Sequence, residues 1–418
     1  TAFENIHELP PGCCLTYGEN TLKVDLKWNP VSYIDPQQVQ ADTLIKEIEF
    51  SLETWHSPYQ NIFLSLSGGL DSTSLLYCLK RTQKKHQTIK ALNLYHPDIP
   101  SSHELPYAQR VCDDLDIELI GLDVSDLLPF SPPHKPLLSK PHKPFPLLTH
   151  LRQIEKIQEL VHSSASSLFV SGQGGDHIFL APPPKTLFID YILEKGWAGS
   201  KSQLQKLTHY YRTSFYSILK YSGRHLIHHY LSSQRVIFNK DIAPWMTQEF
   251  QNLGSRAFVH PLYSKLARKI KIGKCAHIQT IENAFSTSAI DVIGGNSIYN
   301  PLLYQPVVEL ALSIPTYETL QEGYDRYPFR KAISQSFNTD YVWRRSKGET
   351  SGIMQLGLKK NLNDIKMLCL EGELGRHHLI KKDELYIHIK RIAQGKIFYS
   401  GHSLILFRPR LFSPIGNH

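Results

Sequence analysis

Apolar runs alternate with amphipathic segments along the first part of the chain. Segments with apolar residues at helical spacing cover 38–53, 71–83, 104–115 and 147–165. Short apolar runs between them predict four buried strands at 61–67 (NIFLSLS), 89–95 (IKALNLY), 117–124 (IELIGLDV) and 167–172 (SLFVSG). This alternation is typical of an α/β fold in which a parallel sheet is covered by helices on both faces.

The pattern changes on either side of this region. After Ala181 it becomes helical with irregular gaps, which predicts a mostly helical C-terminal part. Residues 1–32 contain short extended pieces between turns, and such a β segment is too short to bury a core of its own. We therefore divide the chain into residues 1–32 and 33–418. Repeated proline in 129–146 excludes helix and central strand, so that this segment is either a linker or a lid facing a substrate.

Composition narrows the class of protein and its partners. The net charge of +8 comes from scattered basic residues, which favours an acidic small ligand such as a nucleotide over a nucleic acid. The six cysteines lack the spacing of a zinc site or a disulfide scaffold, so we expect a reducing, cytoplasmic setting. No apolar stretch approaches the roughly 20 residues of a membrane span.

The stretch LSLSGGLDSTSLL, 64–76, lies at a predicted junction of strand and helix. Its glycines allow backbone amides to surround phosphate oxygens, and the start of the helix adds the positive end of its dipole. This is a phosphate-binding loop without the Walker pattern. Asp71 would repel a phosphate unless a cation lay between them, which indicates Mg²⁺.

A second stretch, VSGQGGDHIF at 170–179, has the same order of strand, serine, glycines and aspartate. Because the carboxyl ends of parallel strands open into one crevice, the two loops should face each other. We expect Asp71 and Asp176 to hold the same magnesium ion.

A third candidate is a group of cations far along the chain, within GYDRYPFRKAI and VWRRSKGETSG. A cation folded back over the crevice would stabilise the charge that develops in adenylation or acyl transfer. The group comprises Arg326, Arg330, Arg344, Arg345 and Lys347.

SGGLDS resembles the signature of ATP pyrophosphatases, which cleave ATP to AMP and pyrophosphate. Together with SGQGGDHIF, YNPLLYQPVVELALSIP and RRSKGE, it resembles the synthetase domain of glutamine-dependent asparagine synthetases over about residues 35–360. The resemblance implies an adenine nucleotide alpha hydrolase-like synthetase domain, with Lys347 as the catalytic lysine. Residues 1–32 (IHELPPG before WNP) resemble the end of the glutaminase-like domain of that family, so we expect a longer parent protein and no glutaminase activity in this chain.

Three departures favour another branch of the family. Gln173 replaces a glutamate that handles ammonia, and a glutamine cannot act as a base. His177 replaces an acidic residue, and Tyr304 replaces an aspartate. These changes, together with NLYHPDIPSSHELPYA, resemble the lasso peptide cyclases (macrolactam synthetases). A peptide α-amine, with a pKa of about 7.7–8.0, needs a strong base less than ammonium does.

The resemblance implies an ATP-dependent ligase. It would adenylate an Asp or Glu side chain of a precursor peptide and close an isopeptide ring with the N-terminal amine of that peptide. The cofactors would be ATP and Mg²⁺, and the partners a leader peptidase and a leader-recognition protein. We expect catalytic roles for Lys347, Gln173 and Arg330, metal binding by Asp71 and Asp176, and nucleotide binding by Leu66, Ser67, Gly68, Gly69, Asp71, Ser72, Asn93, Gly172 and Gly174.

Two alternatives of different kinds stay open. One is an asparagine synthetase that uses aspartate and ammonia, against which Gln173 argues. The other is a catalytically inactive scaffold in a peptide-processing complex, against which the retention of both aspartates and Lys347 argues.

Overall fold

The computed structural model describes residues 9, 11–18, 21–34, 41–102, 104–134, 146–231, 243–255, 270–287, 298–345, 348 and 351–395. Most of the proline-rich segment, 135–145, lies outside these ranges.

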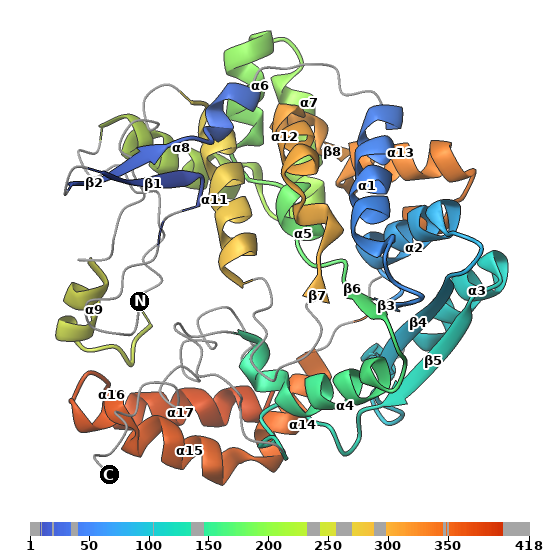
Figure 1. The fold of residues 1–418 in the computed structure, drawn as a ribbon. Coiled ribbons are helices and arrows are strands. Elements are labelled where there is room, and N and C mark those ends of the chain that lie inside the picture. The colour runs from blue at the N-terminus through green and yellow to red at the C-terminus, as the bar shows by residue number, and fades with distance from the viewer. Residues whose placement is uncertain are drawn as a thin grey trace.

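A five-stranded parallel sheet organises the first part of the fold and lies toward the right in Figure 1. Its order is β5-β4-β3-β6-β7, and every neighbouring pair is parallel. The four predicted strands are confirmed, and the fifth, β7, lies in a region where the sequence pattern predicted only helix. The strands are β3 (Asn61–Ser65), β4 (Thr88–Tyr95), β5 (Glu118–Asp123), β6 (Ser167–Val170) and β7 (Ile298–Tyr299).

Helices cover both faces of this sheet, as predicted. Successive side chains of a strand point to opposite faces, so a strand buried on both sides is apolar throughout. In β3, Ile62 and Leu64 belong to the main core, whereas Phe63 packs in a separate cluster with Val161. The main core also contains buried residues of α1 (Ala41–His56), α2 (Leu70–Thr82) and α3 (Leu105–Leu115), and Val161 belongs to α4 (Leu151–His162).

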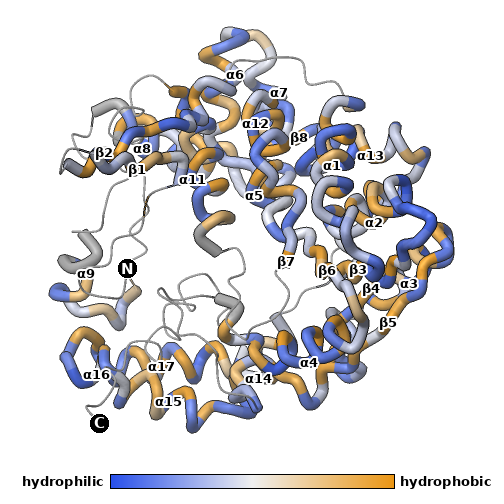
Figure 2. The backbone as a smooth tube through the Cα atoms, viewed as in Figure 1, coloured by the Kyte–Doolittle hydropathy of each residue, from blue (hydrophilic) through white to orange (hydrophobic). Residues whose placement is uncertain are grey.

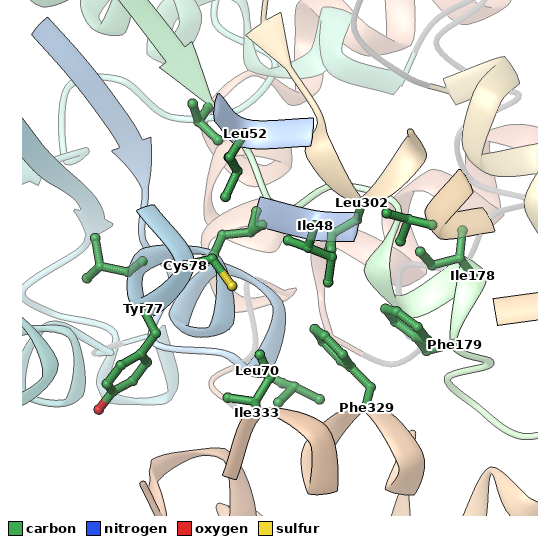
Figure 3. Close-up of a cluster of buried hydrophobic side chains, with 14 of the residues drawn as sticks. Ile48, Leu52, Leu70, Tyr77, Cys78, Ile178, Phe179, Leu302, Phe329 and Ile333 are labelled. Atoms are coloured by element: carbon green, nitrogen blue, oxygen red, sulfur yellow. The ribbon is translucent and has the colours of Figure 1, made fainter. Parts of the chain in front are cut away.

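The main core joins segments that lie far apart in the sequence. Phe179 and Phe329 stack with their ring centroids 4.2 Å apart, beside Ile48 and Leu302 (Figure 3). This contact packs α13 (Tyr327–Phe337) against the residue that follows the second loop and α5 (Gly175–Ile178). Figure 2 shows hydrophobic and hydrophilic stretches alternating along the helices.

The described residues after Ala181 are mostly helical, as predicted; their strands are β7 and the short hairpin of β8 (Leu320–Gln321) and β9 (Tyr324–Asp325). A two-residue strand is too short for a period-two pattern to reveal it. The helices from the second loop onward are α5 (Gly175–Ile178), α6 (Leu187–Lys195), α7 (Ser200–Tyr211), α8 (Phe215–Leu231), α9 (Gln248–Ser255), α11 (Ile272–Thr287), α12 (Gln305–Ser313), α13 (Tyr327–Phe337), α14 (Ser351–Lys360), α15 (Leu362–Glu371), α16 (Glu373–Arg376) and α17 (Lys382–Ala393).

The N-terminal extended pieces form an antiparallel hairpin of β1 (Cys13–Gly18) and β2 (Thr21–Leu26). The hairpin is largely exposed, and the chain after it leans on the main domain, where the Trp28 indole donates to Glu309 of α12 (2.7 Å). The boundary between residues 1–32 and 33–418 stays a prediction. Within the described ranges, no helix has the length and apolar character to cross a membrane.

Candidate active site

The first loop leaves the sheet at the end of β3 and is fixed by backbone and hydroxyl contacts. The Leu66 amide donates to the Leu92 carbonyl (2.8 Å). The Ser67 amide donates to the Ser72 hydroxyl (3.1 Å), and the two serine hydroxyls lie 3.2 Å apart. Gly68 has a φ of +69°, a left-handed conformation that favours glycine. The loop is therefore closed on itself and turns sharply into α2.

Helix α2 begins next to this turn, with Gly69 at its N-cap and Asp71 in its first turn. The free amides and the dipole of a helix start attract anions. Asn93, at the end of β4, is 1% exposed and donates to the Leu66 carbonyl (2.7 Å). Its Oδ1 is buried and has no hydrogen-bond partner among the described residues, so a polar acceptor beside this loop is available to a ligand.

The second loop follows β6 and packs directly on the first. The Gln173 amide donates to the Ser171 hydroxyl (3.1 Å). A Cβ on Gly172 would lie 3.0 Å from the Ser72 nitrogen, and one on Gly175 would overlap the Asp71 carboxylate. Only glycine permits this approach, which explains why the second loop needs residues without side chains here.

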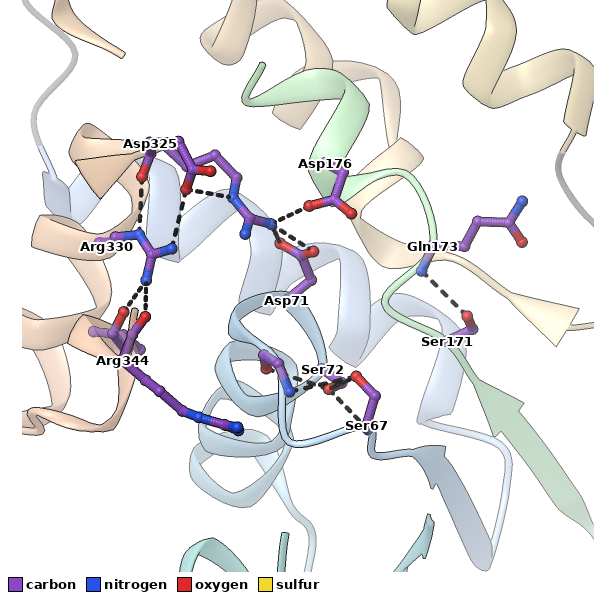
Figure 4. A network of polar contacts seen from close by, with 12 residues as sticks. Ser67, Asp71, Ser72, Ser171, Gln173, Asp176, Asp325, Arg330 and Arg344 are labelled. Atoms are coloured by element: carbon purple, nitrogen blue, oxygen red, sulfur yellow. Dashed lines mark hydrogen bonds and ion pairs between the residues drawn. The ribbon is translucent and has the colours of Figure 1, made fainter. Parts of the chain in front are cut away.

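Arg326 joins the two loops by bridging their aspartates. Its guanidinium donates to both oxygens of Asp71 (3.0 and 2.8 Å) and to Asp176 (2.5 Å), as Figure 4 shows. The Arg326 side chain is only 6% exposed. Burial lowers the pKa of Arg326, but Asp71, Asp176 and Asp325 outweigh this effect and hold that pKa above its usual value. The guanidinium therefore stays charged between the carboxylates.

Asp325 and Arg330 hold this bridge in place from the other side. Asp325 contacts Arg326 (3.4 Å) and Arg330 (3.0 Å), and the Tyr210 hydroxyl donates to it (2.8 Å). Burial raises the pKa of Asp325, yet the two arginines hold it below its usual value. Arg326 itself has a φ of +52° at the N-cap of α13, a conformation that costs a non-glycine residue free energy.

Arg344 brings the end of the cationic segment onto the first loop. Its guanidinium pairs with Glu104 (2.7 Å) and lies 3.4 Å from the centre of the Tyr107 ring. It also donates to the Gly68 carbonyl (3.5 Å), and a Cβ on Gly348 would overlap Glu104. Lys347 lies outside the described residues, and Arg344 before it and Gly348 after it both lie against Glu104, which is next to the first loop.

Most of the predicted site residues lie in this one region. The network described above contains or adjoins the first loop, Asp71, Asn93, Gly172, Gly174, Asp176 and Arg330. The side chain of Gln173 extends away from the two carboxylates in Figure 4.

Sequence reasoning named Arg326 only as one of five cations. Glu104 and Leu303, against which Gly174 packs, were not singled out. The charge and position of Arg326 were visible in GYDRYPFRKAI, but its pairing with two loops 150 and 255 residues away was not.

The carboxylate pair fits magnesium chemically. One nitrogen of Arg326 contacts both Asp71 and Asp176, so a magnesium ion held by both carboxylates would take the place of this guanidinium. The described residues contain no cluster of three or more acidic, histidine or cysteine ligands. Two protein carboxylates match the usual magnesium site, in which phosphates and waters complete the shell.

Comparison with known proteins assigns the region that holds both loops. Residues 61–186 match the asparagine synthase family. This segment is similar to asparagine synthase domains. It runs from β3 to the residues after α5 and includes both aspartates.

A relative of nearly the whole chain is the microcin J25-processing protein McjC from Escherichia coli. The two are 22% identical over 389 residues, which make up 88% of this chain and 63% of that protein. The chain therefore spans less than two thirds of the length of this relative.

Two solved structures are similar to part of this chain. An NH3-dependent NAD synthetase from Campylobacter jejuni is 20% identical over 34% of this chain and 61% of its own, with a TM-score of 0.25. A U34-tRNA thiolase from Methanococcus maripaludis is 12% identical over 65% and 88%, with a TM-score of 0.29. At these scores neither structure informs the geometry of the site.

Proposed function

We propose that this chain is an ATP-dependent ligase that closes the macrolactam ring of a lasso peptide. It adenylates an Asp or Glu side chain of a precursor peptide and joins it to the N-terminal amine of the same peptide. The asparagine synthase domain supports ATP-dependent amide formation, and the likeness to a microcin-processing protein supports a peptide substrate. The observation that carries the proposal is the convergence of the two aspartate loops of that domain on one buried cation.

The first loop is the proposed phosphate site. The backbone of Ser67–Ser72 and the start of α2 offer amides and a favourable dipole to anionic oxygens. The unpartnered Oδ1 of Asn93 offers a buried acceptor next to them. Asp71 and Asp176 would hold magnesium, which when bound neutralises phosphate charge.

The reaction consists of two balanced steps. An oxygen of the peptide carboxylate attacks the α-phosphorus of ATP, so that a bond between carboxylate and phosphorus forms and pyrophosphate leaves. The neutral N-terminal amine then attacks the activated carbonyl carbon. An amide bond forms, the bond from carbon to the AMP oxygen breaks, and one proton is released. The net change in the peptide is the loss of one water.

Cationic groups around the crevice serve these steps. Lys347 stabilises the oxyanion of the second step, as the family resemblance implies. Arg330 is held by Asp325 and by the carbonyls of Val342 and Arg344, so it fixes the segment that leads to Lys347. Gln173 cannot act as a base, and the peptide amine does not need a strong one, because its ordinary pKa leaves an appreciable fraction neutral.

The setting of the reaction belongs to the same proposal. All six cysteines are free, which fits a reducing, cytoplasmic compartment. A leader peptidase and a leader-recognition protein would supply the processed precursor, and no nucleic acid takes part.

Carboxylate-dependent exchange of labelled pyrophosphate into ATP tests the first step. The precursor peptide encoded beside the gene would be supplied with its amine acetylated, so that only adenylation can occur. We expect exchange with the acidic peptide and none after its carboxylates are converted to amides. Asp71→Ala is the blank, and Arg376→Ala, which alters an exposed pair on α16, is the matched control. Absence of exchange in the unchanged chain would contradict the proposal.

The asparagine synthetase alternative is separated by its substrates. Aspartate and ammonium with Mg·ATP should give no asparagine above the Asp71→Ala blank. Formation of asparagine at a rate above that of peptide closure would replace the proposed function with that alternative.

A further inference from the structure

A groove of about 1090 Å³ lies beside the proposed active site and outside the asparagine synthase domain. Its walls come from the end of α7 and the start of α8 on one side and from the β8–β9 hairpin with Arg330 and Arg345 on the other. This volume slightly exceeds the roughly 300–1,000 Å³ of small-molecule pockets, and it is enough for several residues of an extended peptide.

The groove is connected to the active site by shared residues. Asp325 and Arg330 line it, and the same Asp325 contacts Arg326, which bridges Asp71 and Asp176. A ligand in the groove would therefore lie next to the charge network of the proposed reaction centre.

The charge of the groove favours an anionic ligand. Three arginines and one aspartate line it, and that aspartate is already paired with Arg326 and Arg330. Arg212 and Arg345 are exposed, and no ion pair with a carboxylate is formed by either within the described residues. Arg guanidinium groups bind carboxylates through paired hydrogen bonds, so these two positions are suited to acidic side chains.

Aromatic groups complete the lining. The guanidinium of Arg345 lies 4.8 Å from the centre of the Tyr324 ring, and the guanidinium of Arg330 lies 5.5 Å from the same ring centre. Tyr210 and the half-exposed Phe215 lie on the opposite wall. Tyrosine, phenylalanine and arginine are the residues that dominate peptide and protein recognition.

We infer that this groove binds an acidic segment of the peptide substrate and that Arg212 and Arg345 recognise its carboxylates. The inference rests on the proposed function for the identity of the ligand as a peptide. It assigns substrate selection to a surface built from α7, α8 and the β8–β9 hairpin, apart from the loops that bind ATP.

Equilibrium binding in the absence of ATP tests this assignment. The probe is a labelled twelve-residue peptide of glycine, serine and glutamate, and its partner carries glutamine in place of every glutamate. We expect the unchanged chain to bind the acidic peptide about tenfold more tightly at low salt, a factor that matches roughly two partly exposed charge pairs. Arg212→Ala combined with Arg345→Ala should abolish the preference, while Arg376→Ala should keep it.

Charge reversal sharpens the same test. Arg212→Glu combined with Arg345→Glu should prefer a lysine version of the peptide over the acidic one. Equal binding of the acidic and amide peptides to the unchanged chain would overturn the inference, as would an undiminished preference in the double alanine variant. The inference is also overturned if a single-stranded oligonucleotide, and not the acidic peptide, depends on the two arginines.

The peptide-binding test and the pyrophosphate-exchange test have separate outcomes. A preference for the acidic peptide without pyrophosphate exchange would overturn the proposed function and leave the anionic groove in place. Pyrophosphate exchange without any preference for the acidic peptide would overturn the inference about the groove and leave the proposed function in place.

Discussion

Replacement of Arg326 by methionine is the most informative perturbation of the site. Methionine keeps much of the side-chain volume and removes the charge that lies between the aspartates. Asp71 is 13% exposed and loses both of its hydrogen bonds to Arg326, whereas Asp176 is 41% exposed and stays screened by water. Asp325 keeps its pair with Arg330. The variant therefore removes the Arg326 ion pair from one largely buried carboxylate, that of Asp71.

The expected loss of stability follows from this one broken ion pair. Breaking a buried ion pair by removing one partner costs about 3–5 kcal/mol, and the partial exposure of the site favours the lower end. With an unfolding entropy of about 2.1 cal/mol/K per residue, about 3 kcal/mol over the 418 residues lowers the unfolding midpoint by about 3 °C.

Calorimetry of a double-mutant cycle measures the coupling. In the Asp71→Asn background, Arg326→Met should lower the midpoint by less than about 1 °C, because the charge that Arg326 compensates is gone. Arg376→Ala, at an exposed pair, should change the midpoint by less than about 1 °C. Equal losses from Arg326→Met in both backgrounds would refute the bridging role of this arginine.

Three further predictions concern other parts of the fold. Gly175→Ala should lower the unfolding midpoint by about 1–3 °C and reduce AMP formation, because its methyl group would overlap Asp71; Gly223→Ala, with open space around its Cβ, is the control, and equal behaviour of the two would contradict the tight approach of the loops. Burial lowers the pKa of Lys274 to about 7, so the unfolded state binds more protons between pH 7 and about 10.4 and stability rises with pH there; Lys274→Met should lose that rise, and an unchanged pH profile would disprove it. Lys347→Ala should bind ATP normally and form product slowly, and unchanged turnover would remove its catalytic role.

The sheet could be predicted because its strands are apolar on both faces and alternate with amphipathic helices. In β3, successive residues point to opposite faces of the sheet, yet Ile62, Phe63 and Leu64 are all buried. A continuous apolar run of this kind is typical of a strand that is covered on both faces. Strand β7 escaped prediction because Ile298 and Tyr299 form only two residues of strand, which are stabilised by pairing with β6 and not by a pattern of their own.

The loops of the site could be predicted from serine, glycine and aspartate at strand ends. The position of Arg326 could not, because a cation in GYDRYPFRKAI reads as surface until the fold brings it to Asp71 and Asp176. Its left-handed backbone is set by the turn between β9 and α13, which sequence composition does not specify. Long-range ion pairs of this kind depend on tertiary packing.

Intact-mass analysis of the precursor peptide after incubation with the chain and Mg·ATP tests the central claim most directly. The account predicts a peptide product that is lighter by one water, with one AMP and one pyrophosphate formed from ATP for each peptide closed. No such product should form with Asp71→Ala or with an acetylated amine. A peptide of unchanged mass, or ring closure accompanied by ADP and phosphate, would contradict it.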